Sequence, residues 1–326
     1  MSKSSPLPHR CHVLGIEDFS APEINAILDR AEEHAADALQ GRSPVPVLSG
    51  AMIGQLFFEP STRTRVSFEV AAKRLGAEIV NIPAATSSVA KGETLLDTCL
   101  ALESIGLDAL VIRHPETGSI KSLADRLSIP LLNGGDGTGE HPTQAILDAL
   151  TIRQRLGRFA GLTMTIIGDL RHSRVVRSHL LLWQKLDLKV RLVGPRPLWP
   201  EKMPEDAVLT SEMAEGIAGA DMLYVIRPQL ERWGELSLDK ETYRRDYQVT
   251  PDWLAHAKPQ AFVMDAGPTY RDLQITSALF DDDERCTARQ QMRNGTFVRM
   301  ACLEMVIAAA RQQKASSSQA QSQGAA

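Results

Sequence analysis

The chain reads Phe57-Phe58-Glu59-Pro60-Ser61-Thr62-Arg63-Thr64-Arg65-Val66-Ser67-Phe68 at the point where an apolar run gives way to hydroxyl and guanidinium side chains. The run 52–58 has the composition of a strand, and a proline ends it. Ser61 or Thr62 can then cap a helix that ends at Gly76. The apolar positions expected on this helix include Val66, Val70 and Leu75. The stretch therefore predicts a strand that feeds directly into a helix.

Groups that bind anions gather at the start of this predicted helix. Its first turn presents backbone amides without intrahelical partners and the positive end of the helix dipole. The sequence adds hydroxyl and guanidinium groups from Ser61, Thr62, Arg63, Thr64 and Arg65. The pattern predicts a phosphate-binding site. The alternative is an ordinary capped helix with a solvated basic face.

Apolar, strand-like runs alternate with helical patterns along the rest of the chain, which predicts parallel sheets covered by helices. The expected strands are 55–58, 78–82, 109–113, 130–132, 164–167, 190–193, 222–226 and 262–264. At 326 residues, the chain has the length of two domains. We therefore predict an α/β protein with two domains, each a parallel sheet flanked by helices, joined by two interdomain helices.

The first domain is expected to span 1–140 and to be completed by a C-terminal helix at about 294–312, whereas the second spans 141–293. A helix from Pro142 to about Leu156 connects the two predicted sheets. The segment 133–139 is rich in glycine and is either a linker or a mobile loop beside a site. The tail 315–326 contains only Ser, Gln, Ala and Gly, so we expect it to be disordered.

Composition excludes several classes of partner. The 36 basic and 40 acidic residues give a formal net charge of -4 and a pI near 6.1, which disfavours nucleic acid or an acidic membrane as the main partner. No apolar run is long enough to cross a bilayer, and no export segment follows the N-terminus, which predicts a cytoplasmic protein. The four cysteines lack metal-binding spacing, so we expect reduced thiols and no metal.

Polar residues repeatedly follow the carboxyl ends of the predicted strands, where open α/β sheets bind their ligands. Taken singly, each of these arginines is more typical of a surface residue than of a ligand contact. Their shared placement favours one anion-rich site. The segments concerned are Arg113-His114-Pro115, 168–174, Arg227-Pro228-Gln229 and Asp265-Ala266-Gly267-Pro268.

His141-Pro142-Thr143-Gln144 makes a second local pattern, because proline suits the first position of a helix. His141 then lies at the cap and Gln144 about one turn later, so both can face one small polar ligand. His141 either donates to a carbonyl oxygen of that ligand or satisfies the neighbouring glycine-rich segment.

The chain shows no arrangement of serine, cysteine and histidine that is typical of a covalent nucleophile, and no glycine-rich nucleotide loop. Its candidate site residues are oxyanion donors and cations, with neither a nucleophile nor a cofactor motif. Chemistry of this kind requires one substrate to attack the other directly.

These residues resemble the aspartate carbamoyltransferase family, within the aspartate/ornithine carbamoyltransferase superfamily. Its members join carbamoyl phosphate to the amine of L-aspartate in pyrimidine biosynthesis. The resemblance covers about Val13 to Gln312. It rests on Ser61-Thr62-Arg63-Thr64-Arg65, Ser87 through Lys91-Gly92-Glu93-Thr94, Arg113-His114-Pro115, His141-Pro142-Thr143-Gln144, Gly168-Asp169-Leu170 with Arg174, and Arg227-Pro228-Gln229.

The resemblance implies a role for each matching residue. Those implied to hold the phosphate are Ser61, Thr62, Arg63 and Thr64, with Arg113 also reaching it. Those implied to act on the carbamoyl group are Thr64, Arg113 and His141 at its oxygen and Gln144 at its nitrogen. Those implied to bind aspartate are Arg174, Arg227, Gln229 and Lys91. Ser87 and Lys91 are implied to enter the active site of a neighbouring subunit in a homotrimer, and regulatory or dihydroorotase subunits are candidate further partners.

The sequence departs from the family at Asp265-Ala266-Gly267-Pro268, where members usually carry His-Pro-x-Pro. Carbonyls of this turn normally meet the carbamoyl amide and the aspartate amine, a role open to Gly267 and Pro268. A carboxylate near two anionic substrates weakens their binding unless a neighbour such as Arg271 neutralises it. The alternative is that Asp265 points away and pairs locally.

Three functions are consistent with these residues. The first is an active aspartate carbamoyltransferase. The second is a transcarbamoylase for another amine, and Asp265 would suit an amine that carries a cationic side chain. Two features oppose this alternative: Arg227-Pro228-Gln229 resembles the aspartate type, and the Cys-Leu-Pro turn of ornithine enzymes is absent. The third is a weakened paralogue that serves as a structural partner of another pyrimidine enzyme.

Overall fold

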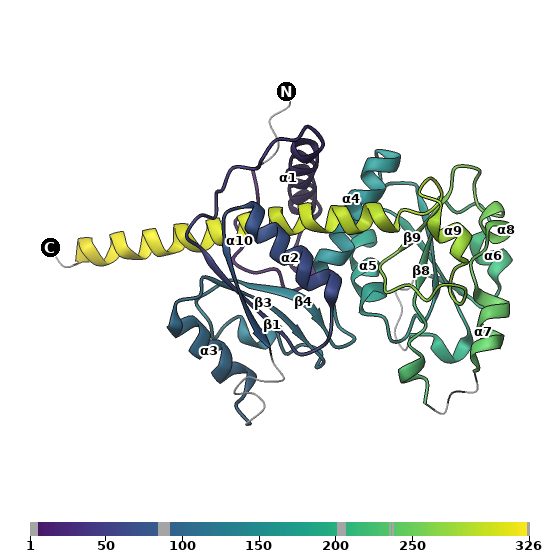
Figure 1. The fold of residues 1–326 in the computed structure, drawn as a ribbon, viewed down its shortest axis with the longest axis horizontal. Helices are drawn as coiled ribbons and strands as arrows, with labels where there is room; N and C mark the ends of the chain where they lie inside the picture. Colours follow the sequence, from purple (N-terminus) through teal and green to yellow (C-terminus); the bar gives the residue numbers. More distant parts are fainter. Residues whose placement is uncertain (1–5, 84–91, 201–206, 235, 237, 325–326) are drawn as a thin grey trace. The chain divides into compact units, whose positions relative to one another are not determined.

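The computed structural model describes residues 6–83, 92–200, 207–234, 236 and 238–324. The chain forms two compact units (Figure 1), of which unit 1 comprises Met1–Ile146 and Asn294–Ala326, and unit 2 comprises Leu147–Arg293. Each unit contains one parallel sheet flanked by helices, which confirms the predicted fold class. The boundary falls inside α4 (Pro142–Leu156) and α10 (Ala288–Gly324), so the chain passes between the units within two continuous helices.

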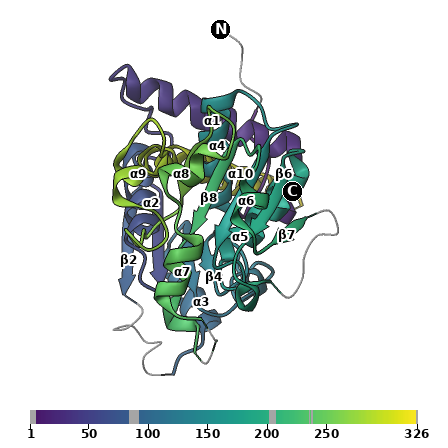
Figure 2. The ribbon, with the colours of Figure 1, turned by 90° about the vertical axis from the view of Figure 1, so that its right-hand side faces the viewer.

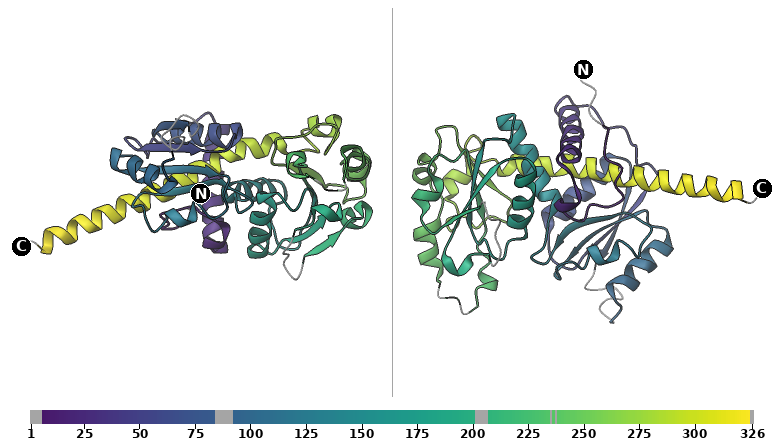
Figure 3. Two further views of the ribbon diagram at one scale, coloured as in Figure 1. Left: turned by 90° about the horizontal axis from the view of Figure 1, so that it is seen from below. Right: turned by 180° about the vertical axis from the view of Figure 1, so that it is seen from behind.

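Unit 1 contains a four-stranded sheet in the order β2-β1-β3-β4. The chain adds strands on both sides of β1, so the strand order reverses between β1 and β3. Helix α3 lies on the opposite side of this sheet from α1 (Figures 1 and 3). Between the sheet and α3 lies an apolar core that includes Leu56, Cys99, Leu110 and Ile112. The elements are α1 (Ala21–Leu39), β1 (Met52–Phe57), α2 (Thr62–Arg74), β2 (Glu78–Pro83), α3 (Leu95–Ile105), β3 (Ala109–His114) and β4 (Leu131–Asp136).

Unit 2 contains a five-stranded sheet in the order β7-β6-β5-β8-β9, part of which is seen in Figure 2. Its strand order reverses between β5 and β8, because β6 and β7 extend one side and β9 the other. Among the described residues, none of the helices in either unit combines the length and the hydropathy that crossing a bilayer requires. The elements are β5 (Thr163–Gly168), α5 (Arg174–Lys185), β6 (Lys189–Val193), β7 (Val208–Thr210), α6 (Met213–Ile217), β8 (Met222–Ile226), α7 (Lys240–Tyr247), α8 (Pro251–Ala255), β9 (Phe262–Asp265) and α9 (Ser277–Asp281).

The glycine-rich segment is the main correction to the predicted secondary structure. Leu131–Asp136 forms β4, and all six of its residues are buried, so most of the segment is neither a linker nor a mobile loop. A Cβ atom on Gly134 would lie 3.2 Å from the carbonyl oxygen of Ile112 on the neighbouring strand. Glycine is therefore present here because the backbones approach closely. The short strand β7 was not predicted, since three residues give too little alternation to recognise.

Two helices differ from expectation. The buried residues of α2 are Thr64, Phe68, Ala71 and Ala72, whereas the predicted apolar position Val66 is 44% exposed. The prediction from large apolar residues was wrong because alanine and threonine form much of the buried face of α2. Helix α10 continues to Gly324, through most of the tail predicted to be disordered. Alanine, serine and glutamine permit this, because extending an existing helix needs no new nucleation.

Candidate active site

In unit 1, the predicted site residues follow the carboxyl ends of three adjacent strands. The segment Ser61–Thr64 follows β1, Arg113 lies at the end of β3, and His141 follows β4. The strand order reverses between β1 and β3, and open α/β sheets bind ligands at such reversals. The residue patterns at the strand ends and the strand order therefore both indicate that a ligand binds at the carboxyl edge of this sheet.

Helix α2 begins at Thr62, with Ser61 in the N-cap position. Ser61 has extended backbone geometry but makes no side-chain capping hydrogen bond, so its hydroxyl is not used to close the helix end. Thr62 and Arg63 are exposed, whereas Thr64 is buried. This helix start thus offers hydroxyl, guanidinium and backbone amide donors to an anion.

Thr64 and His141 are 77 residues apart in the sequence and in contact in the fold. The Thr64 hydroxyl lies 3.3 Å from Nε2 of His141, and each residue is 5% exposed. His141 immediately precedes Pro142, the first residue of α4, as the sequence pattern predicts. Gln144 follows in the first turn of that helix and is 8% exposed. The two predicted motifs therefore lie side by side in unit 1.

Two groups hold the guanidinium of Arg113 at the end of β3. Its Nη1 donates to the carbonyl oxygen of Gly134 at 3.0 Å, and its Nε lies 3.3 Å from Oε2 of Glu59. Its side chain is 15% exposed. Glu59 lies between β1 and α2, and it was not among the predicted site residues. The structure adds Glu59 to the residues that shape this half of the site.

Two buried carboxylates hold the segment that leads into His141. Asp136 accepts the backbone N–H groups of Glu140 at 2.7 Å and of Gly118 at 2.9 Å. Glu140 accepts the backbone N–H of Ile16 at 2.8 Å. Sequence reasoning missed both acidic residues, although their proximity to a glycine-rich segment before a helix was a usable signal. These bonds restrict the backbone position from which His141 projects.

In unit 2, the predicted residues again follow adjacent strands at a reversal of strand order. Arg174 is the first residue of α5, after β5, and Arg227 directly follows β8. Gly267 and Pro268 follow β9. The strand order reverses between β5 and β8, so Arg174 and Arg227 flank the position where such a sheet binds ligands.

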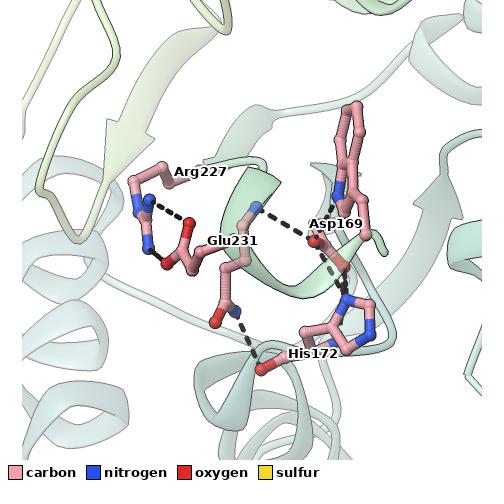
Figure 4. Close-up of polar contacts among 6 residues, drawn as sticks. Asp169, His172, Arg227 and Glu231 are labelled. Carbon is pink, nitrogen blue, oxygen red and sulfur yellow. Dashed lines mark hydrogen bonds and ion pairs between the residues drawn. The ribbon is translucent and has the colours of Figure 1, made fainter. Parts of the chain in front are cut away.

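A hydrogen-bond network around Asp169 joins the segments after β5 and β8 (Figure 4). Asp169 is fully buried and accepts the backbone N–H of Gln229 at 3.0 Å and the indole N–H of Trp233 at 3.1 Å. Nδ1 of His172 lies 2.9 Å from the same carboxylate. The side-chain amide of Gln229 donates to the carbonyl oxygen of His172 at 2.8 Å. Gln229 therefore holds these two segments together in this structure.

Arg227 makes a two-point ion pair with Glu231, four residues further along the chain (Figure 4). Its Nη2 and Nη1 lie 2.5 and 3.2 Å from the two carboxylate oxygens. The Arg227 side chain is 25% exposed and that of Glu231 is 57% exposed. The hydrogen bond from Arg227 lowers the pKa of Glu231, which keeps its carboxylate ionised.

Asp265 points into the protein and pairs locally. It is 2% exposed, and its carboxylate accepts hydrogen bonds from the backbone of Gly267 and the side chains of Thr269 and Gln274. Arg271, the predicted neutralising neighbour, instead pairs with Asp281 at 2.7 and 2.8 Å. Of the two positions considered for Asp265, the structure adopts the local one.

Three further expectations concern residues away from these strand ends. Ser87 and Lys91 lie outside the described residues. Burial raises the pKa of the Cys99 and Cys302 thiols to about 12, so both remain protonated near neutral pH. In the part of the chain that the structure describes, no group of three or more His, Cys, Asp or Glu residues could hold a metal ion.

Comparison with known families covers both units. The model of the aspartate/ornithine carbamoyltransferase carbamoyl-P binding domain matches residues 11–154, and that of the Asp/Orn binding domain matches residues 160–306. The aspartate carbamoyltransferase catalytic subunit of Rhodospirillum rubrum is 45% identical over 91% of this chain and 94% of its own length. That of Sphingopyxis alaskensis is 46% identical over 91% and 87%.

Two solved structures extend the comparison. Aspartate transcarbamoylase from Trypanosoma cruzi in complex with carbamoyl phosphate has a TM-score of 0.83 at 35% identity, over 90% of this chain and 95% of that one. Ornithine carbamoyltransferase from Pyrococcus furiosus has a TM-score of 0.82 at 27% identity, over 91% and 97%. The matched family models and the sequence identities agree, and the chain belongs to the aspartate/ornithine carbamoyltransferase family.

Proposed function

We propose that this chain is an aspartate carbamoyltransferase. It transfers the carbamoyl group of carbamoyl phosphate to the amine of L-aspartate, releasing phosphate, in pyrimidine biosynthesis. The observation that carries this proposal is the identity of 45% and 46% to aspartate carbamoyltransferase catalytic subunits over 91% of the chain. The ornithine enzyme shares 27%.

Carbamoyl phosphate binds to unit 1 in this proposal. The start of α2 supplies the donors for its phosphate, through Ser61, Thr62, Arg63 and Thr64, and Arg113 also reaches that group. Thr64, Arg113 and His141 polarise the carbamoyl oxygen, and Gln144 binds the carbamoyl nitrogen. The 3.3 Å contact between Thr64 and His141 supports this assignment, because it brings two of the three donors to one point.

Aspartate binds to unit 2. Arg174 and Arg227 each bind one carboxylate, with Gln229 assisting, because guanidinium groups match the planar geometry of carboxylates. The carbonyl oxygens of Gly267 and Pro268 accept hydrogen bonds from the carbamoyl amide and the aspartate amine. The placement of these residues after β5, β8 and β9 supports this division of roles.

The reaction follows from these contacts. The neutral aspartate amine attacks the carbamoyl carbon and forms the new C–N bond, the C–O bond to phosphate breaks, and the departing phosphate takes the proton that the amine loses. Negative charge develops first on the carbonyl oxygen and then on the departing phosphate. Donors fixed in advance at these two positions stabilise the transition state more than the ground state. The attacking nitrogen belongs to the substrate, so no protein nucleophile is required.

The chain also acts, we propose, as a homotrimer with shared active sites. Ser87 and Lys91 enter the site of the neighbouring subunit, where Lys91 contacts aspartate. Regulatory or dihydroorotase subunits are candidate further partners. The family resemblance of the Ser87 to Thr94 motif supports the shared site.

One assay tests the function. Purified protein is given carbamoyl phosphate together with L-aspartate, L-ornithine or a panel of other amines, and phosphate release is measured. Release that depends on aspartate is the expected result. Release only with another amine identifies a different transcarbamoylase, and release with none identifies a structural paralogue; either result refutes the proposal.

A further inference from the structure

The carboxylate of Asp265 lies inside the turn that follows β9. Its Oδ1 accepts the backbone N–H of Gly267 at 2.7 Å. Its Oδ2 accepts the hydroxyl of Thr269 at 2.7 Å and the side-chain amide of Gln274 at 3.0 Å. Gln274 is fully buried, and its Oε1 accepts the backbone N–H of Tyr270 at 3.0 Å. One carboxylate thus binds the turn at both of its ends.

The backbone of Asp265 is held from the opposite direction. Its N–H donates to Oε1 of Gln291 at 3.0 Å, and Nε2 of Gln291 donates to Asp148 at 2.7 Å. Asp148 also accepts the hydroxyl of Tyr224 at 2.8 Å and lies 2.9 Å from Nε2 of His179. Gln291 is 2% exposed, and the other three partners are fully buried. Asp265 is therefore anchored to a buried polar network within unit 2.

The turn itself leaves two carbonyl groups available to a ligand. Gly267 has φ +63°, a backbone conformation that other residue types adopt only with strain. Gly267 is half-buried and Pro268 is exposed. Among the hydrogen bonds of the described residues, none is accepted by the carbonyl oxygen of Gly267 or of Pro268.

We propose that Asp265 is a positioning residue for carbamoyl transfer. Its carboxylate, together with Gln291, fixes the turn so that the carbonyl oxygens of Gly267 and Pro268 accept hydrogen bonds from the carbamoyl amide and the aspartate amine. This inference rests on the proposed function. From the sequence alone, the negative charge of Asp265 is expected to weaken the binding of two anionic substrates. The inference instead gives its carboxylate a function that favours the reaction.

A carboxylate suits this position because it only accepts hydrogen bonds and has room for several donors. The backbone N–H, hydroxyl and amide donors of Gly267, Thr269 and Gln274 disperse its charge. Asparagine can keep one acceptor for Gly267 and turn its NH₂ group toward the Thr269 hydroxyl, which can also accept, but this NH₂ then faces the amide donor of Gln274, whose hydrogen bond is lost. Alanine removes every acceptor that position 265 offers to Gly267, Thr269 and Gln274.

The test compares Asp265→Ala and Asp265→Asn with the parent enzyme in the full-length protein. For Asp265→Ala, kcat is expected to fall by about 10- to 100-fold, because small displacements of positioning groups have effects of this size. The KM for carbamoyl phosphate stays within about twofold, since the phosphate donors lie in unit 1. Asp265→Asn recovers part of the lost kcat, because it keeps the acceptor for Gly267 and loses the one for Gln274.

Two measurements separate positioning from loss of folded protein. Titration with N-(phosphonacetyl)-L-aspartic acid counts competent sites, and thermal unfolding reports the fold. We expect one site per chain to remain in Asp265→Ala, with weaker affinity for this ligand and unchanged affinity for inorganic phosphate. Asp252→Ala is the matched control, because Asp252 is exposed on α8 and lies outside the turn that Asp265 binds. Its kcat should equal that of the parent.

Thr269→Val keeps the test decisive if Asp265→Ala does not fold. This nearly isosteric change removes one donor at a half-buried position and should lower kcat by about three- to tenfold. The inference is overturned if Asp265→Ala folds and keeps the parental kcat. If Asp265→Ala does not fold, parental kcat in Thr269→Val overturns it. So does Asp265→Asn that is folded but as slow as Asp265→Ala. A parent enzyme without aspartate-dependent turnover refutes the proposed function instead.

Discussion

The guanidinium of Arg227 is held by the carboxylate of Glu231 through two ion contacts of 2.5 and 3.2 Å. Arg227 is the residue proposed to bind a carboxylate of aspartate, and it directly follows β8. An arginine side chain loses substantial rotamer freedom when it binds a ligand, and a bidentate partner removes part of that cost in advance. Glu231 therefore orients the guanidinium that is proposed to receive the substrate.

Replacing Glu231 by alanine is expected to raise the KM for aspartate by about two- to fivefold, the range that a partly exposed ion pair supports. The KM for carbamoyl phosphate should not change. Initial rates at varied aspartate concentration provide the measurement, and Glu241→Ala, at an exposed ion pair on α7, serves as the control. A lower KM for aspartate would show that Glu231 competes with the substrate rather than orienting Arg227.

Arg63→Ala and His141→Ala should each lower kcat by about 100- to 1,000-fold, or roughly 3 to 4 kcal/mol of transition-state stabilisation. Each removes one donor at a position where negative charge develops. Thermal unfolding should show that both variants remain folded. Lys73→Ala lies on the same helix as Arg63 at an exposed ion pair with Glu69, and it should keep parental turnover. Near-parental turnover in both site variants would reject their assignment.

Mixed trimers test the shared site. Lys91→Ala chains and Arg63→Ala chains are expected to be almost inactive alone and to regain activity when they are mixed, because some sites then contain neither substitution. The measurement is specific activity after separation of mixed trimers by an affinity tag on one chain. Verified mixed trimers with no recovered activity would remove the proposal that Lys91 acts in the neighbouring subunit.

Arg10→Ala should produce a pH-dependent loss of stability. Two hydrogen bonds from Arg10, at 2.8 and 3.0 Å, lower the pKa of Glu23 to about 2 from its ordinary 4.5. Because the folded-state pKa is depressed, the stabilisation is fully present above pH 4.5 and is lost as the pH falls toward 2. The Tm difference between parent and variant should therefore narrow on acidification below pH 4.5. A Tm difference that stays constant or widens below pH 4.5 would show that the pair of Arg10 and Glu23 is not the source of this stabilisation.

Local patterns of residues were sufficient to predict several helices and strands. Helix α4 has the predicted limits, Pro142–Leu156, because proline and hydrophobic spacing define its start and its buried face. Strand β8, Met222–Ile226, also matches the prediction, since a short apolar run is sufficient to indicate a buried strand. The positions of Arg113, His141, Arg174 and Arg227 beside their strands and helices followed from these elements.

The side chains that these residues contact depend on how distant segments pack together in the folded protein. Asp265 pairs with Gly267, Thr269 and Gln274, which is the local alternative of the two that the sequence left open, and Glu59 contacts Arg113 from another strand end. Such choices depend on distances and angles between backbones brought together by packing, which residue types along the chain do not encode locally. The same reason explains β4: close approach of two backbones, visible only in the folded sheet, accounts for Gly134, whose residue type alone suggested a loop.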